Sequence, residues 1–199
     1  MKMTVTAILP LDRRRCKIFL DGEFAFVLYR SETKKFGMEE NSELKEADYC
    51  EIMQTLLPKR ARERALYFLK TQDRTEAEIL RKLREGGYPP SVCQSVLAFL
   101  KEYHYVDDAS YAARYIESQK DKKSAKRLRY DLMQKGIPDT LLKELLEENP
   151  CDEEKQIRAW LEKKHLTPGE LDNRERQKAM ASLARKGFSW DAIQRIFRL

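Results

Sequence analysis

Apolar residues recur along the chain in an outline that is repeated three times. Each copy places a leucine four residues before a glycine and an apolar residue directly after that glycine. Further apolar residues follow six and nine positions beyond the glycine, which is the spacing of one helix face. The three glycines, Gly87, Gly136 and Gly187, lie 49 and 51 residues apart. A period of about 50 residues is typical of helical repeat proteins.

Each copy predicts one helix that ends at the glycine and another that begins just beyond it. Glycine adopts the left-handed conformation that commonly terminates a helix, and a side chain would be disfavoured there. A proline or serine then starts the next helix, at Pro89, Pro138 and Ser189. An amphipathic stretch also precedes each pair. We therefore expect three short helices per copy, nine in all from about residue 59 onward.

The first 36 residues carry the only β-strand signal. Asp21-Gly22 lies between two apolar segments, and this dipeptide favours a tight hairpin because both central turn positions need positive φ. Phe24, Phe26 and Leu28 alternate with other residues, so we expect them to share one face. A sheet this small is marginal alone and should pack on the segment that follows. The predicted strands are residues 4–9, 16–20 and 23–29.

These patterns predict a mainly α protein. We expect three tandem three-helix repeats that form an elongated, curved array. A small β-hairpin or three-stranded sheet with one helix should precede them. We expect that helix over residues 46–57, with Pro58 breaking or restarting it. The predicted division is 1–58 for the sheet-and-helix extension, then 59–105, 106–149 and 150–199 for the repeats.

Composition favours small helical units with hydrated outer faces over one large core, because 36% of the 199 residues are charged and 42% are hydrophobic. No run of about 18 apolar residues is present, and the amino terminus lacks a secretory core with a cleavage site. We therefore expect a cytoplasmic protein that does not enter a membrane.

Catalytic and metal-binding signatures do not emerge from the sequence. The four cysteines are scattered, only two histidines occur, and no close-spaced set of zinc ligands is formed. Phosphate-loop, nucleophile-elbow and H-E-x-x-H patterns are absent as well. We expect no enzyme activity, no cofactor and no metal.

Basic residues are concentrated in a way that favours an anionic partner, in a chain of net charge +6 and pI near 9.0. Residues 120–135 and 174–198 each carry a local charge of +5, and Arg13 to Arg15 with Lys17 form a third cluster. The alternative is that these are ordinary solvated helix faces. The predicted contact residues are Lys120, Lys122, Lys123, Lys126, Arg127, Arg129, Arg174, Arg176 and Lys178.

Several segments, taken in order, resemble a known family. They are Ala65-Leu66-x-x-Leu69, Thr75-x-x-Glu78-Ile79-x-x-Lys82-Leu83-x-x-x-Gly87-Tyr88, Tyr105-Val106-Asp107-Asp108-x-x-Tyr111-Ala112, Leu132-x-x-Lys135-Gly136-Ile137, Arg174-x-Arg176-Gln177-Lys178 and Leu183-x-Arg185-Lys186-Gly187-Phe188. Their order and spacing over about residues 59–199 are similar to those of the RecX regulatory proteins, modulators of the recombinase RecA. The hairpin around Asp21-Gly22 is similar to the extension of longer members.

The resemblance implies a non-enzymatic regulator of homologous recombination, DNA repair and the SOS response. It would bind the RecA–single-stranded-DNA filament and mostly inhibit filament growth, ATP hydrolysis and strand exchange. Its partners would be that filament, single-stranded DNA and also double-stranded DNA, and we expect a monomer. One departure is Lys123-Ser124-Ala125, where the family usually has a Lys-Gly-Pro-like step, although Ser124 can cap the helix.

Two other functions stay open at this point. One is a general nucleic-acid-binding helical-repeat protein that affects a filament only by occupying DNA. The other is a helix-turn-helix transcription factor, since each repeat contains a helix, a glycine turn and a helix. Steep salt dependence without sequence preference would favour the first two functions over the third.

Overall fold

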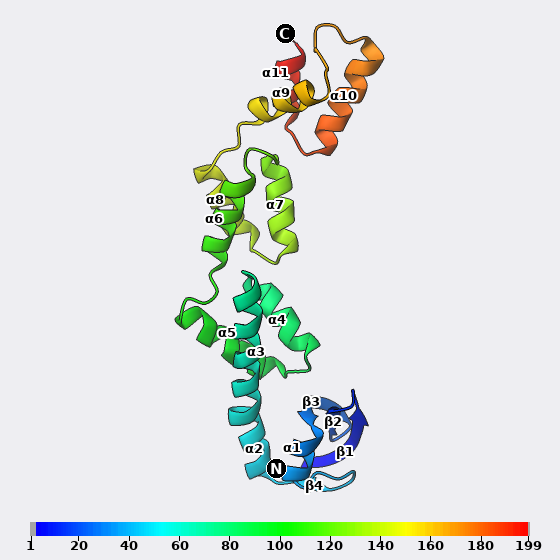
Figure 1. Cartoon of the computed structure of the whole chain (residues 1–199), viewed down its shortest axis with the longest axis vertical. Helices are drawn as coiled ribbons and strands as arrows, with labels where there is room; N and C mark the ends of the chain where they lie inside the picture. The colour runs from blue at the N-terminus through cyan, green and yellow to red at the C-terminus, as the bar shows by residue number, and fades with distance from the viewer. Residues whose placement is uncertain (1–2, 199) are drawn as a thin grey trace. The chain divides into compact units, whose positions relative to one another are not determined.

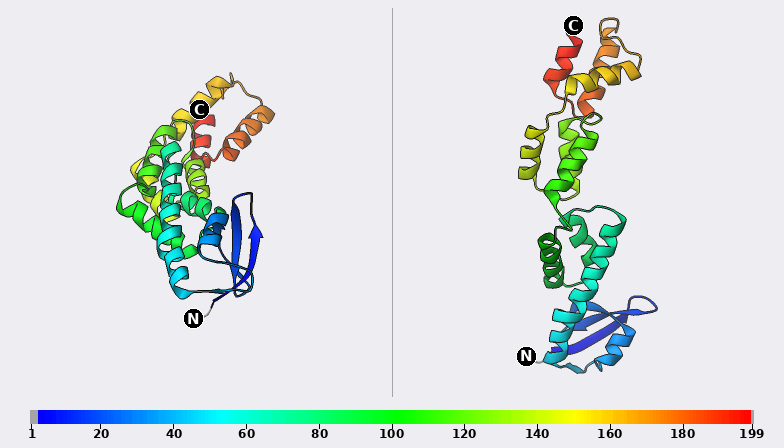
Figure 2. Two further views of the ribbon diagram at one scale, coloured as in Figure 1. Left: turned by 60° about the horizontal axis from the view of Figure 1, so that its bottom comes forward. Right: turned by 60° about the vertical axis from the view of Figure 1, so that its left-hand side comes forward.

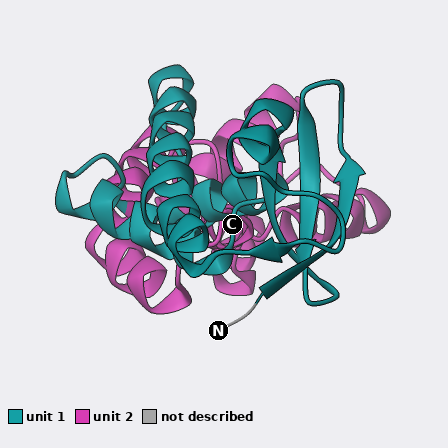
Figure 3. Ribbon diagram, turned by 90° about the horizontal axis from the view of Figure 1, so that it is seen from below, with its two compact units in different colours: residues 1–107 teal, residues 108–199 magenta. Residues whose placement is uncertain are grey.

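The computed structural model of the chain describes residues 3–198. It comprises two compact units, residues 1–107 and residues 108–199 (Figure 3). The first contains the β-sheet and five α-helices, and the second contains six α-helices (Figure 1). The prediction of a mainly α protein with a small amino-terminal sheet is confirmed.

Unit 1 begins with an antiparallel four-stranded sheet in the order β3-β2-β1-β4. Asp21 and Gly22 join β2 to β3 with φ of 50° and 90°, so the predicted hairpin turn is present. The fourth strand was not predicted, because its two residues are too few to show an alternating pattern. The strands are β1 (Met3–Pro10), β2 (Arg15–Leu20), β3 (Glu23–Tyr29) and β4 (Glu43–Leu44).

A bulge in β3 changes which side chains face the core. Ile18 pairs with Phe26 whereas Phe19 pairs with Phe24, so β3 carries one extra residue between its pairs. Phe26 is fully buried, but Phe24 is 46% exposed. The prediction that Phe24 shares the buried face of Phe26 and Leu28 was therefore wrong, because a bulge interrupts the alternation on which it depended.

The helix that follows the sheet is longer than predicted. The chain runs without interruption from α2 through a π-helical turn, η1, into α3, and Pro58 lies in the first turn of α3. A proline is tolerated there because its missing N–H is not needed by the α-helical ladder, so Pro58 does not break the helix. The helices of unit 1 are α1 (Arg30–Lys35), α2 (Glu46–Glu51), η1 (Ile52–Leu56), α3 (Leu57–Thr71), α4 (Glu76–Glu85) and α5 (Pro90–Glu102).

The sheet and the first three-helix repeat share one hydrophobic core. Ile18 and Phe26 from the sheet belong to the same buried cluster as Ile52 and Leu83 from the helices. The expectation that the sheet packs on the helical segment is confirmed. This packing gives a small sheet the apolar partner that it needs.

Unit 2 contains the second and third repeats, which can be followed in Figure 2. Each repeat has its own buried cluster, one around Leu128 and Leu132 and the other around Ile157 and Leu183. Two cores of this size agree with helical units that are each small. The helices are α6 (Asp108–Gln119), α7 (Ala125–Gln134), α8 (Asp139–Glu148), α9 (Glu153–Lys163), α10 (Asn173–Arg185) and α11 (Trp190–Phe197).

The three repeated glycines end their helices in the same way, with φ of 79°, 85° and 88°. In each case the residue after the glycine donates its N–H to the carbonyl of the repeated leucine. The glycine itself donates its N–H to the carbonyl of the residue that directly follows that leucine. This is the Schellman arrangement, so the predicted helix ends are confirmed. The leucine contacts are Tyr88 to Leu83 at 3.3 Å, Ile137 to Leu132 at 3.2 Å and Phe188 to Leu183 at 3.3 Å.

The two histidines of the chain occupy the same left-handed position at the ends of two other helices. His104 follows α5 with φ of 56°, and His165 follows α9 with φ of 54°. The next residues, Tyr105 and Leu166, donate to carbonyls five residues back at 2.8 and 3.0 Å. The left-handed conformation of these two residues was not predicted, because histidine is a less specific helix-stop signal than glycine.

Candidate nucleic-acid interface

The second and third repeats meet where the glycine turn after α10 contacts the start of α7. Ser124 accepts a hydrogen bond from the Arg127 N–H at 3.3 Å and so caps α7. A β-carbon at Gly187 would lie 2.8 Å from Ser124 Oγ, closer than real β-carbons approach. The turn fits against the helix start because residue 187 has no side chain.

Gln156, on α9, strengthens this junction from the other side. Its Nε2 donates to the carbonyl oxygen of Lys120 and, at 3.3 Å, to that of Lys123. The side chain is only 7% exposed, yet its Oε1 has no hydrogen-bond partner among the described residues. One acceptor is thus left over in the wall of the junction.

A groove of about 530 Å³ opens between the two repeats of unit 2. Trp160 and Phe188 contribute apolar rings to its lining, and Asp121 contributes its single carboxylate. The basic side chains that line it come from both repeats: Lys122, Lys123, Arg127, Lys163, Arg185 and Lys186. With six cationic residues and one carboxylate, the groove has a local charge of +5 and suits a polyanion.

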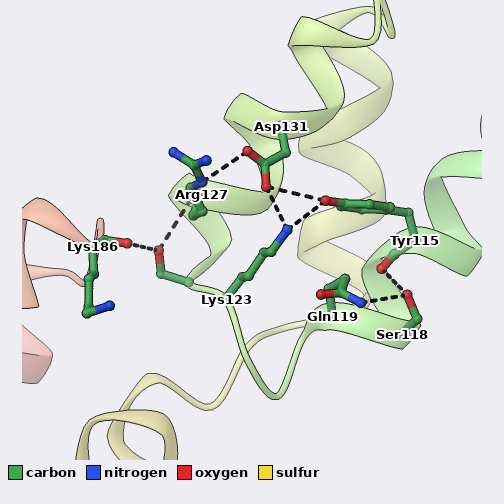
Figure 4. A network of polar contacts seen from close by, with 8 residues as sticks. Tyr115, Ser118, Gln119, Lys123, Arg127, Asp131 and Lys186 are labelled. Carbon is green, nitrogen blue, oxygen red and sulfur yellow. Dashed lines mark hydrogen bonds and ion pairs between the residues drawn. The ribbon is translucent and has the colours of Figure 1, made fainter. Parts of the chain in front are cut away.

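Two of these groove cations also hold the second repeat together. Lys123 Nζ donates to Tyr115 Oη at 2.8 Å and to Asp131 Oδ2 at 2.9 Å (Figure 4). Arg127 approaches the other oxygen of Asp131 at 3.0 Å, and its guanidinium lies over the Tyr130 ring. These four residues around Asp131 join α6, the loop before α7 and α7 itself.

The Asp131 network sets the protonation of its members. Hydrogen bonds to Tyr115 and Asp131 raise the pKa of Lys123. Burial alone would raise the pKa of Asp131, but the hydrogen bond from Lys123 and the charges of Lys123 and Arg127 lower it overall. Both partners are therefore charged near neutral pH.

Two further predicted contact residues are engaged inside the repeat. Arg129 forms a two-pronged ion pair with Asp139, at 2.5 and 2.6 Å, and this hydrogen bonding raises the pKa of Arg129. Lys120 pairs with Glu117 at 2.6 Å, and that hydrogen bond raises the Lys120 pKa. Their positive charge is largely balanced by carboxylates within the same unit.

The remaining predicted contact residues divide into two places. Lys122 and Lys126 are exposed near the start of α7, and within residues 3–198 neither makes an ion pair. Arg174 and Lys178 are exposed on the first turns of α10, and Arg176 donates to the Pro168 carbonyl at 3.4 Å. Arg174, Arg176 and Lys178 do not line the groove, so the structure does not bring them together with the residues near the start of α7 there.

Sequence reasoning missed the groove residues that the third repeat supplies. Lys163 is the last residue of α9, Arg185 is the last residue of α10, and Lys186 follows it in the glycine turn. The +5 charge of residues 174–198 was the available signal, but charge density alone pointed to the beginning of α10. The contact of the Gly187 turn with the start of α7 places Lys186 in the groove, and no local pattern in the sequence reports this contact.

Other types of site find little support in the part of the chain that the structure describes. Within residues 3–198 no group of three or more His, Cys, Asp or Glu side chains is placed to hold a metal ion. The four cysteines are free thiols, and burial raises the pKa of Cys93 and Cys151. No described helix is both long and apolar enough to cross a membrane.

Comparison with family models gives three matches in the order of the repeats. Residues 61–100 match the first three-helix domain of RecX, residues 107–146 match the second, and residues 152–197 match the third. Together these matches cover more than half of the chain.

Curated relatives and solved structures agree with the family models. The chain is 29% identical to regulatory protein RecX of Clostridium acetobutylicum, over 98% of this chain and 95% of the relative. It is 33% identical to regulatory protein RecX of Bacillus subtilis, over 92% of this chain and 70% of the relative. A crystal structure of regulatory protein RecX covers 98% of both chains with a TM-score of 0.63 and 26% identity. RecX from Lactobacillus salivarius has a TM-score of 0.62 and 25% identity, over 71% of this chain and 95% of that one.

Proposed function

The chain belongs to the RecX family of regulatory proteins, and from this premise we propose that it binds the RecA–single-stranded-DNA filament. Binding limits filament growth, ATP hydrolysis by RecA and strand exchange. The protein acts as a monomer in the cytoplasm, and its partners are the filament and DNA, single-stranded or double-stranded. It performs no catalysis of its own.

The observation that carries this proposal is the basic groove between the repeats of unit 2. Phosphate groups would be neutralised by its lysines and arginines, which releases counterions and favours binding. The rings of Trp160 and Phe188 offer surfaces on which unpaired bases can stack without regard to sequence. A groove of this chemistry supports contact with a nucleoprotein filament.

The groove cations differ in what they contribute. Lys163, Arg185 and Lys186 are exposed, and their side chains make no ion pair or hydrogen bond to another described residue. Lys123 and Arg127 are already bound to Asp131. We therefore assign the main anion contacts to the first three residues and to Lys122, while Lys123 and Arg127 mainly fix the wall of the groove.

The helix-turn-helix alternative is disfavoured for the second repeat by α8, the helix that follows its glycine turn. In that motif the second helix lies in the major groove and reads bases. Here α8 carries Asp139, Glu144, Glu147 and Glu148 against a single basic residue, Lys143. A helix of this charge would be repelled by phosphates. The general nucleic-acid binder remains the alternative that an experiment must separate.

Titration of the full chain into RecA on single-stranded DNA, with ATP hydrolysis as the readout, tests the proposal. The informative variants are Lys163→Glu and Lys186→Glu, since neither residue is needed for an internal ion pair. Arg158→Glu is the matched control, because Arg158 is exposed on α9 but outside the groove. Lys178→Glu tests the basic residues at the start of α10.

Inhibition by the wild-type chain at concentrations too low to coat the DNA is the expected result. Lys163→Glu and Lys186→Glu should weaken inhibition, and Arg158→Glu should not. Inhibition that occurs only when the DNA is saturated would favour the general nucleic-acid binder. Loss of inhibition in Lys178→Glu, with the groove variants unaffected, would move the interface to α10.

A further inference from the structure

Unit 1 contains a second basic and aromatic groove, far along the sequence from the groove of unit 2. It has a volume of about 200 Å³ and lies between the ends of β2 and β3, the middle of α3 and the turn after α4. Its charged lining residues are Arg15, Arg60 and Arg64, with Glu63 as the carboxylate. Tyr29, Tyr67 and Tyr88 supply aromatic rings.

One wall of this groove is held rigidly by Arg60. Its guanidinium forms an ion pair with Glu32, donates to the Val27 carbonyl at 3.5 Å and lies 4.6 Å from the centre of the Tyr29 ring. The Arg60 and Glu32 side chains are largely buried. Arg60 therefore fixes the sheet against α3, and its charge is balanced within the fold.

The floor of the groove is closed by the turn that ends α4. Tyr88 is buried, and burial raises the pKa of its hydroxyl. A β-carbon at Gly87 would lie 2.3 Å from Val27 Cγ2, so the turn is in close contact with β3. Sheet, helix and turn thus belong to one packed body, and the groove is part of its built shape.

The residues that remain available are Arg64 and Tyr67, one turn apart on α3. Arg64 is exposed, its guanidinium lies 5.2 Å from the centre of the Phe68 ring, and it pairs with no carboxylate among the described residues. Tyr67 is 64% exposed, unusually open for a residue beside a packed groove. Arg15, across the groove, pairs with Asp12 through Nε at 2.7 Å.

We propose that this unit 1 groove is a separate binding site for single-stranded nucleic acid. A backbone phosphate binds Arg64, with the paired Arg15 adding positive charge across the groove, and a neighbouring base stacks on the exposed Tyr67 ring. The combination of guanidinium groups with an open aromatic ring favours a nucleotide over an acidic peptide, which would use the charges and leave the ring in water. The choice of single-stranded DNA as the strand rests on the proposed function.

Direct binding without RecA tests this site. The full chain is titrated into a labelled oligothymidylate for anisotropy, and into an oligonucleotide containing 2-aminopurine, whose fluorescence reports stacking. The variants are Arg64→Glu, Tyr67→Ala and the conservative Tyr67→Phe. Arg81→Glu is the matched control, because Arg81 is exposed on α4 and does not line the groove.

Each variant is measured in the wild-type chain and also combined with Lys163→Glu and Lys186→Glu, which removes the contribution of the unit 2 groove. In the combined background, Tyr67→Ala should weaken binding by about 5- to 150-fold, the range for loss of one stacking side chain. Arg64→Glu should also weaken binding, because it places a negative charge where the phosphate binds. Tyr67→Phe should keep both affinity and the 2-aminopurine signal. Arg81→Glu should keep both as well.

The proposal is overturned if Arg64→Glu and Tyr67→Ala bind like Arg81→Glu, or if the chain with the unit 2 variants binds no oligonucleotide at all. It is also overturned if polyglutamate displaces the oligonucleotide equally well from the wild-type chain and from Tyr67→Ala. The RecA assay separates this result from the proposed function. If the chain binds single-stranded DNA through Tyr67 but never inhibits RecA, the unit 1 site is supported and the proposed function is contradicted.

Discussion

The Ser124 hydroxyl donates a 2.9 Å hydrogen bond to the Lys186 carbonyl oxygen, across 62 positions of sequence. The Oγ of Ser124 also accepts a hydrogen bond from the Arg127 N–H and so caps α7. One buried side chain, 1% exposed, therefore starts a helix in the second repeat and binds the glycine turn of the third. The departure at Lys123-Ser124-Ala125 thus leaves helix α7 properly capped, by a side chain that also joins two repeats.

Ser124 variants should separate these two roles. Ser124→Ala removes both the cap and the bond to Lys186, so we expect the free energy of unfolding to fall by about 1–3 kcal/mol. Ser124→Gly keeps much of the capping preference and should cost less, since glycine is tolerated at the cap position. Urea denaturation measures both, with Ser118→Ala on the exposed surface of α6 as the control. A loss below about 0.5 kcal/mol in Ser124→Ala would contradict a shared structural role.

Gly87→Ala should be destabilising for two reasons, the left-handed backbone and the contact with Val27. The backbone alone costs about 1–2 kcal/mol, and a β-carbon 2.3 Å from Val27 Cγ2 must add to it. In the Val27→Ala background the additional cost of Gly87→Ala should shrink. Thermal or urea unfolding of the four chains gives this coupling. Strictly additive losses would mean that the turn does not press on β3.

Asp131→Asn should destabilise unit 2 near neutral pH by about 1–3 kcal/mol, because it weakens the pair with Lys123 and leaves that cation partly unmatched. The lowered pKa of Asp131 means that its contribution is full above the unfolded value, about pH 4, and is lost as pH falls through the folded value. Because the pKa of Lys123 is raised, Lys123 stays protonated, and its contribution to stability is lost only at strongly alkaline pH.

Unfolding measurements of wild type and Asp131→Asn from about pH 7 to about pH 2 check this dependence. The difference in unfolding free energy between the two proteins should decline only in the acid range. Asp121→Asn, at an exposed neighbouring position, serves as the control for removal of one carboxylate. A difference that stays constant down to the lowest pH would show that Asp131 does not titrate with folding.

Replacing His104 or His165 by glycine should stabilise the protein, since both residues hold a left-handed conformation that disfavours a side chain. The gain should be about 0.5–1 kcal/mol, after the larger flexibility of glycine in the unfolded chain is subtracted. Differential scanning calorimetry measures the shift. Alanine at the same positions should not stabilise, and equal effects of glycine and alanine would contradict the backbone explanation.

Salt dependence of DNA binding should distinguish the groove cations from those engaged in the fold. Each phosphate contact that is lost reduces the slope of log affinity against log salt by about 0.7 for single strands. Lys163→Glu and Lys186→Glu should reduce this slope, whereas Arg158→Glu should leave it unchanged. Arg129→Gln should lower the free energy of unfolding and leave the salt slope nearly unchanged, because Arg129 is paired with Asp139.

The parts of the fold that could be predicted are those that depend on short-range patterns of apolar residues and glycine. Leu83 and Gly87 specify a helix end through contacts within six residues, and this signal survives three times along the chain. The bulge beside Phe24 and the two-residue β4 depend on pairing with distant strands, which local alternation cannot report. His104 was missed for a different reason, because its conformation is imposed by the chain around it and not by its own preference.

The candidate site was predicted only in part. Charge density drew attention to the loop before α7, which lines the groove, yet it could not separate Lys122, which is exposed, from Lys123, which is bound to Asp131. Lys163 was missed because the groove exists only where two repeats meet. Net charge along a sequence counts cations without showing which of them are already neutralised.

The contacts of Gly87 with β3 and of Gly187 with the start of α7 give the packing of the chain a direction. In both contacts the turn that ends a helix packs against an element that comes earlier in the sequence. The approach is so close that the turn residue cannot carry a β-carbon. In unit 1 that earlier element is β3 of the amino-terminal sheet, so the sheet supplies the surface against which the first glycine turn packs. A bulkier side chain at Val27 would therefore disturb a helix end that lies 60 residues further along the chain.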